Sequence, residues 1–280
     1  MAVTRQLASH ALAVAVLGLL AAGCSTEPTY RKEHLANSLQ TLFEQDGLRS
    51  TVRFLSHTLA VQFEHAGALA QTDNQIHIGP TLDQALQKII PAVHRVLLST
   101  DAQVQFYVLL VSDPTIPGAY LTMVRYMDDV RRAQANMLDI PEMFSRTVLD
   151  LNYVDGQPVT LDQYVPKDIK MEEFLSWQLA RRIQTKLTEA LQETGLAEVG
   201  RCAGEFRDGE FAFTLNVVSP GGELDEDTSR TIFQAATGVI ARVLSGYRFD
   251  SFESVRLVLP TTGRHLVLPK AHLSVFRNAP

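Results

Sequence analysis

Two stretches of the sequence end alike: residues 35–48 read LANSLQTLFEQDGL, and residues 183–196 read IQTKLTEALQETGL. In both, apolar residues recur every three or four positions, as on one face of an amphipathic helix. A shift of 148 residues superposes Leu39 on Leu187 and Gly47 on Gly195. A glycine at this point is typical of a helix end. The two stretches indicate that the chain contains one unit twice.

Further elements follow each helix in the same order. A β-like stretch comes next, at 52–65 in the first half and at 198–218 in the second, where residues 207–210, RDGE, signal a hairpin turn. A second helix and two more strands then follow in each half. The expected segments are a helix at 81–98 with strands at 104–111 and 120–126, and a helix at 226–245 with strands at 255–259 and 265–268.

This order predicts an α+β fold of two similar helix-strand-helix-strand-strand modules, with antiparallel sheets and helices packed on one face. We place the first module at residues 31–130, a connecting segment at 131–170 and the second module at 171–280. Because few residues are identical between the halves, one continuous α+β domain with coincidental similarity is the alternative.

Composition excludes several classes of protein. Of the 280 residues, 46% are hydrophobic and 20% are charged, a globular balance that excludes extensive disorder. The formal net charge of −6 disfavours a nucleic-acid partner, which requires a concentrated excess of Lys and Arg. Two cysteines are too few for a disulfide-dense mini-domain or a four-thiolate zinc site.

The N-terminus contains an unbroken apolar run from Ala11 to Ala22. A membrane-spanning helix needs about 20 such residues, so this run has the length of a signal-peptide core instead. It ends in residues 20–24, LAAGC, which resemble the lipobox of bacterial lipoproteins. The usual lipobox has Leu three residues before the cysteine, whereas here Ala21 holds that position and Leu20 precedes it.

The resemblance implies a signal peptide at residues 1–23, lipidation of Cys24 and a linker at 24–30. The acyl chains would anchor the protein to the lipid bilayer on the periplasmic side of the bacterial cell envelope. Ser25, rather than Asp, favours the outer membrane where the usual sorting rule applies. The alternatives are a plain secretory signal with Cys24 an incidental thiol, or a buried N-terminal helix, which the lack of polar residues at helical spacing disfavours.

No motif for catalysis or cofactor binding stands out. The loop at 220–223, PGGE, lacks the Lys of a phosphate-binding loop, and no Gly-x-Ser-x-Gly elbow is present. His57, His65 and His77 are the candidates for a metal site, but eight strand residues separate the first two by about 26 Å. We therefore expect no catalytic residue, cofactor or metal.

Four other features have a structural and a functional reading. Asp128-Asp129 opens a helical segment, where helix capping is favoured over an acid–base pair or calcium binding. Arg181-Arg182 is expected on a solvated helix face. Cys202 is interpreted as a small buried hydrophobe rather than a nucleophile. Trp177, the only tryptophan, lies beside the apolar stripe of its helix and is either core rim or a contact surface.

Two classes of function remain. The first is a membrane-anchored envelope lipoprotein with a non-catalytic binding or assembly role, whose partner is another envelope protein. The second is a membrane-tethered hydrolase or small-ligand binder with a site that the sequence does not reveal. The absence of any enzyme motif favours the first.

Overall fold

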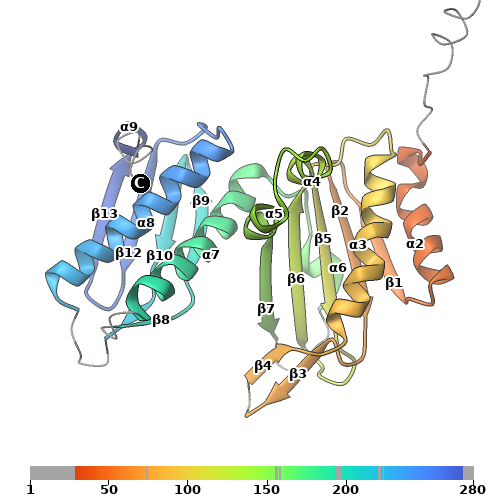
Figure 1. The fold of residues 1–280 in the computed structure, drawn as a ribbon, viewed down its shortest axis with the longest axis horizontal. Coiled ribbons are helices and arrows are strands. Elements are labelled where there is room, and N and C mark those ends of the chain that lie inside the picture. Colours follow the sequence, from red (N-terminus) through yellow and green to blue (C-terminus); the bar gives the residue numbers. More distant parts are fainter. Residues whose placement is uncertain are drawn as a thin grey trace, which may run out of the picture.

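The computed structural model describes residues 29–73, 75–154, 157, 159–192, 197–219, 222 and 224–273. These residues form two α+β modules that lie next to each other (Figure 1), which confirms the predicted fold class. The apolar run, the lipobox, Cys24 and Gly195 lie outside the described residues. None of the described helices is both long and apolar enough to cross a membrane.

The first module packs two helices against one face of a five-stranded sheet. The helices are α2 (Leu35–Gln45), after a 3-10 turn at Lys32–His34, and α3 (Leu82–Leu98). In sheet order the strands are β1 (Ser50–Phe54), β2 (Thr58–Glu64), β5 (Phe106–Ser112), β6 (Ala119–Tyr126) and β7 (Val148–Tyr153). A separate hairpin, β3 (Leu69–Thr72) with β4 (Gln75–Ile78), extends from the lower end of this module (Figure 1).

The second module has a four-stranded sheet and two long helices. The helices are α7 (Met171–Gln192) and α8 (Glu226–Gly246). In sheet order the strands are β9 (Ala203–Arg207), β10 (Glu210–Thr214), β12 (Ser254–Leu259) and β13 (Arg264–Pro269). Asp208 and Gly209 join β9 to β10 with φ angles of 50° and 80°, the positive values that a tight hairpin turn requires. Three small elements complete the module: β8 (Glu198–Val199), its partner β11 (Val217–Val218) and α9 (Lys270–Leu273).

The segment between the modules contributes structure of its own. The short helices α4 (Met127–Gln134) and α5 (Ile140–Arg146) follow β6 directly, and β7 then adds a fifth strand to the first sheet. The last helix before the second module is α6 (Leu161–Tyr164).

Both modules share one topology. When only the strands of the main sheets are counted, each runs helix, two strands, helix, two strands. The sheet order is β1-β2-β5-β6 in the first, with β7 added at its edge, and β9-β10-β12-β13 in the second. The β-like stretch expected at 52–65 is part of a hairpin, β1–β2, and the turn expected at 207–210 joins the hairpin β9–β10. The sheets are mixed rather than wholly antiparallel, because the central pairs β2–β5 and β10–β12 run parallel across the α3 and α8 crossovers.

In the first module, helices α2 and α3 cover one face of the sheet as expected, and the other face is covered as well. Its second face, with Ala60, Phe106 and Val108, is buried in the same apolar cluster as the core of the second module. The ring centroids of Phe106 and Phe174, the latter on α7, lie 5.2 Å apart. Helix α7 therefore belongs to both modules and fixes one against the other.

Candidate functional site

A cleft of about 520 Å³ opens where the two modules meet. Its walls are β6 and β7, the connection from α6 to α7, the exposed side of α7 and the residues at the start of β9. We call it the intermodule cleft. Its polar and aromatic lining residues are Tyr120, Asp150, Asn152, Gln163, Tyr164, Lys167, Asp168, Glu173, Trp177, Arg181 and Arg201.

Trp177 stands on the wall that α7 provides. The buried stripe of this helix includes Phe174, Leu175 and Leu179, and Trp177 falls outside it. As a result 36% of the tryptophan surface is exposed beside the cleft. A large aromatic side chain in this position presents apolar surface to a binding partner, while the other side of its helix packs in the core.

Asp150 on β7 joins both modules through two arginines. Arg181 Nη2, from α7, lies 3.1 Å from Asp150 Oδ1, and Arg201 Nη2 also donates to this carboxylate. Arg181 donates as well to the carbonyl oxygen of Leu149, from Nε at 3.1 Å and from Nη2 at 2.7 Å. Because β7 is the last strand of its sheet, this guanidinium covers an edge carbonyl that would otherwise face solvent.

Arg181 and Arg182 were expected on a solvated helix face, and that expectation is wrong. Both side chains are about a quarter to a third exposed, and each is paired across the module boundary, Arg181 with Asp150 and Arg182 with Glu142 at 3.6 Å. Charge spacing within α7 could not reveal these partners, because they lie more than 30 residues away in the sequence.

The other two carboxylates of the cleft are also engaged. Burial works to raise the pKa of Asp168, but hydrogen bonds from the backbone of His57 and from Thr58 hold it below its usual value. Burial also works to raise the pKa of Glu173, but a hydrogen bond from Lys167 helps to hold that pKa below its usual value. The Lys167 Nζ to Glu173 Oε1 distance is 2.5 Å. Both acids are therefore ionised near neutral pH and occupied by donors, which suits structure better than proton transfer.

Cys202 lies under the cleft floor and is buried, as expected for a small hydrophobe. Burial raises the pKa of its thiol to about 11. Its backbone N–H donates to Gln184 Oε1 at 3.2 Å. A thiol that stays protonated and enclosed is a poor nucleophile.

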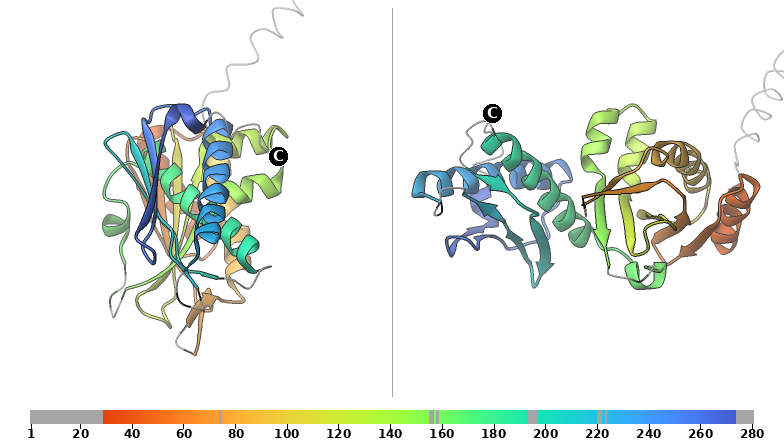
Figure 2. Two further views of the ribbon diagram at one scale, coloured as in Figure 1. Left: turned by 90° about the vertical axis from the view of Figure 1, so that its left-hand side faces the viewer. Right: turned by 90° about the horizontal axis from the view of Figure 1, so that it is seen from below.

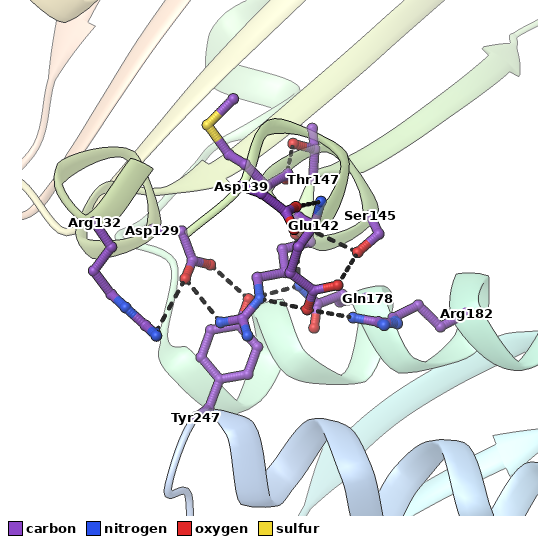
Figure 3. A network of polar contacts seen from close by, with 11 residues as sticks. Asp129, Arg132, Asp139, Glu142, Ser145, Thr147, Gln178, Arg182 and Tyr247 are labelled. Atoms are coloured by element: carbon purple, nitrogen blue, oxygen red, sulfur yellow. Dashed lines mark hydrogen bonds and ion pairs between the residues drawn. The ribbon is translucent and has the colours of Figure 1, made fainter. Parts of the chain in front are cut away.

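A buried network on the other side of α7 holds the modules together (Figure 3). At its centre is Asp129, 4% exposed, which accepts hydrogen bonds from Arg146 Nη1 at 3.0 Å and from the Tyr247 hydroxyl at 2.7 Å. Gln178 Nε2 donates to the same hydroxyl at 2.8 Å and to the carbonyl oxygen of Arg146 at 2.6 Å. The network therefore connects α4, α5, α7 and α8.

The capping interpretation of Asp128-Asp129 needs correction. Both lie in the first turn of α4, where an acid favours the helix dipole, but no side chain caps this helix and its N-cap position is Tyr126. Burial raises the pKa of Asp129 against the opposing effect of Tyr247 and Arg146. Burial and the nearby Asp129 carboxylate also raise the pKa of Tyr247, so the phenol remains a hydrogen-bond donor.

The candidate metal ligands do not come together. His57 precedes β2 and His65 follows it, so they lie at opposite ends of one strand, while His77 is exposed on β4. Over the described ranges, no three His, Cys, Asp or Glu side chains form a group that would hold a metal ion.

A second buried polar chain lies beneath α3 in the first module. His94 Nε2 is 2.9 Å from the hydroxyl of Tyr107, which also accepts from Arg125 Nη1 at 3.2 Å. Arg125 is 3% exposed, donates from Nε to Thr147 Oγ1 at 3.0 Å and lies 5.1 Å from the ring centroid of Phe144. Burial first, and the Arg125 charge second, lower the pKa of His94 to about 4.

Comparison with known proteins adds no family to this geometry: no protein-family model and no curated protein sequence matches the chain.

Proposed function

We propose that this protein is a membrane-anchored bacterial envelope lipoprotein whose body binds another envelope protein at the intermodule cleft, without catalysing a reaction. The observation that carries the binding role is the partly exposed Trp177 with Arg181 and Arg201 beside it. Tryptophan, tyrosine and arginine are the residues that most often dominate the binding energy of protein interfaces.

The state of the ionisable groups supports binding over catalysis. The carboxylates of Asp168 and Glu173 are ionised and bonded to donors, and Asp150 is paired with two arginines. The thiol of Cys202 is protonated at neutral pH. A general base needs a free site for the proton that it takes, and a nucleophile needs an activating partner.

The anchor is carried by the sequence of residues 11–24. Mass spectrometry of the protein extracted from membranes is expected to find an N-terminus at Cys24 that carries a diacylglyceryl group and a further acyl chain. An unmodified mature protein in the periplasmic fraction would rule the anchor out. Cys24→Ser is expected to release or misprocess the protein without unfolding its body.

Affinity capture from detergent-solubilised envelope tests the binding role. We expect wild type to recover one stoichiometric envelope protein and Trp177→Ala to lose it. Val267→Ala is the matched control, because Val267 is an exposed apolar residue on β13, outside the cleft lining. Equal recovery by Trp177→Ala and wild type would contradict the proposal.

The volume of the cleft is also compatible with binding of a small molecule. About 520 Å³ lies within the range of small-molecule sites, so a tethered small-ligand binder is the alternative. Native mass spectrometry distinguishes the two: an empty capture together with a small molecule retained in the cleft would favour the alternative.

A further inference from the structure

Three large apolar side chains in the α4–α5 turn and on α5 are largely exposed, although the ring of Phe144 also lies against the buried Arg125. Met137 is 68% exposed, Ile140 is 55% exposed and Phe144 is 58% exposed. Ile140 and Phe144 are four residues apart on α5, so they lie on the same side of that helix. We call these three residues the α4–α5 patch.

The helix that carries two of these residues is fixed to the body. Met143 on α5 is buried, and Arg146 ties the end of the helix to Asp129 and Glu142. Asp139 caps the start of α5 by accepting from the Glu142 N–H at 2.6 Å. The apolar side chains of the patch therefore point outward from a rigid support rather than from a loop that folds back over them.

The patch lies at the end of the molecule where the described chain begins. Tyr30 N donates to the carbonyl oxygen of Ser99 at 3.2 Å, and Lys32 N donates to Asp101 Oδ1 at 2.6 Å. Ser99 and Asp101 belong to the connection between α3 and β5. The same connection contacts the start of α4, because Met127 N donates to the carbonyl oxygen of Gln105 at 2.7 Å. Figure 1 shows the start of α2 and the α4–α5 turn in the upper part of the first module.

The length of the tether identifies what covers this end. Five residues separate Cys24 from Tyr30, so the Cα atoms of these two residues lie at most about 22 Å apart. An acylated Cys24 would thus keep the upper end of the first module close to the membrane surface. Apolar side chains held near a bilayer insert into its interface, where exposed arginines such as Arg131 lie at headgroup level.

We propose that the α4–α5 patch is a membrane-docking surface, inserted into the interface of the lipid bilayer to which Cys24 is anchored. The proposal rests on the proposed lipid anchor. Docking would fix the orientation of the body, with the β3–β4 hairpin pointing away from the membrane, because that hairpin lies at the opposite end (Figures 1 and 2).

Site-directed fluorescence of the full acylated chain tests this orientation. Ile140→Cys is labelled with an environment-sensitive dye and reconstituted into phosphatidylethanolamine–phosphatidylglycerol vesicles with and without a spin-labelled lipid. Gln75→Cys on the β3–β4 hairpin is the matched control, since both positions are exposed. The native Cys202 does not compete for the dye, because it is buried and its pKa is raised to about 11.

We expect the dye at position 140 to shift its emission to the blue and to be quenched at least about twofold more by the spin-labelled lipid than the dye at position 75. Phe144→Cys is expected to behave like Ile140→Cys. Flotation of the same vesicles measures the anchor separately. If the protein floats but the dyes at 140 and 144 report an aqueous environment, the docking surface is wrong and the anchor stands. If the protein fails to float, both the anchor and the docking surface are wrong. A blue shift without lipid quenching would assign the patch to a protein contact instead.

Discussion

The two modules repeat one topology but bury their sheets differently. In the first module, every residue of β5 from Phe106 to Val111 is buried, because helices α2 and α3 cover one face and the α6–α7 region covers the other. In the second module, β12 alternates between buried residues such as Val255 and exposed residues such as Arg256. The difference shows that α7 serves two sheets, whereas its counterpart α2 serves one.

The largest effect is expected where that sharing is broken. Phe174 on α7 and Phe43 on α2 are both fully buried, so we expect either change to Ala to lower the free energy of unfolding by about 4 kcal/mol. Hydrogen exchange separates them: Phe174→Ala is expected to speed exchange in both sheets, and Phe43→Ala mainly in the first. Equal patterns for the two variants would show that α7 is not shared in this sense.

Removal of the central carboxylate of the network that joins the modules is the next test. Asp129→Ala leaves Arg146 buried with one acid fewer, and we expect a loss of about 3 kcal/mol in urea unfolding. Tyr247→Phe removes two hydrogen bonds, one to Asp129 and one from Gln178, and is expected to cost about 2 kcal/mol. If Asp129→Ala cost no more than Tyr247→Phe, the charge of Asp129 would not be what holds the modules together.

A pH titration sharpens the comparison, because α3 carries the buried His94 and α8 contains no histidine. In the unfolded chain His94 has a pKa of 6.5, whereas in the folded chain its pKa is about 4. Stability therefore falls as the pH drops through this window, by about 2 kcal/mol between pH 7.5 and pH 5. His94→Gln is expected to flatten this part of the pH profile, and an unchanged slope would assign it to other groups.

The smallest effect is expected at the rim of the cleft. Arg201 is well exposed, so loss of its pairing with Asp150 in Arg201→Ala is expected to change the free energy of unfolding by about 0.5 kcal/mol or less. Recovery of the captured envelope partner is expected to fall all the same. A stability loss as large as that of Asp129→Ala would instead make Arg201 a structural clamp between the modules.

The helices could be predicted from sequence because their apolar stripes are local. Leu35, Leu39 and Phe43 are spaced for one helical face, and all three are buried. The acid that caps α8 is also a local signal: Asp225, directly before the helix, accepts a hydrogen bond from the Thr228 N–H. Signals of this kind are contained within a few residues of the element that they specify.

Strand β7 was not predicted, although Asp150 and Asn152 alternate with Leu149 and Leu151. Its alternation is short, and it lies in a segment that we interpreted as a connection. Its polar residues also face the cleft and meet arginines from the second module. When the partners of a strand's side chains lie far along the chain, the sequence near the strand gives little indication of it.

The site was even less accessible to sequence reasoning. The partners of Asp129 include Tyr247, 118 residues away, and no spacing rule connects two such positions. The ion pairs of the network with a local signal are Glu142–Arg146, four residues apart on α5, and Asp129–Arg132, three residues apart on α4. Trp177 was identified as a possible contact surface because it lies beside its helix stripe, but the cleft around it comes from long-range packing.

The double duty of α7 also limits where this chain can be cut. A polypeptide that ended after β7 would contain a complete five-stranded sheet, yet Phe106, Val108 and Val124 would have no cover on the second face. An exposed apolar surface of that kind promotes aggregation. The first module therefore cannot be moved into another protein by recombination unless α7 is moved with it.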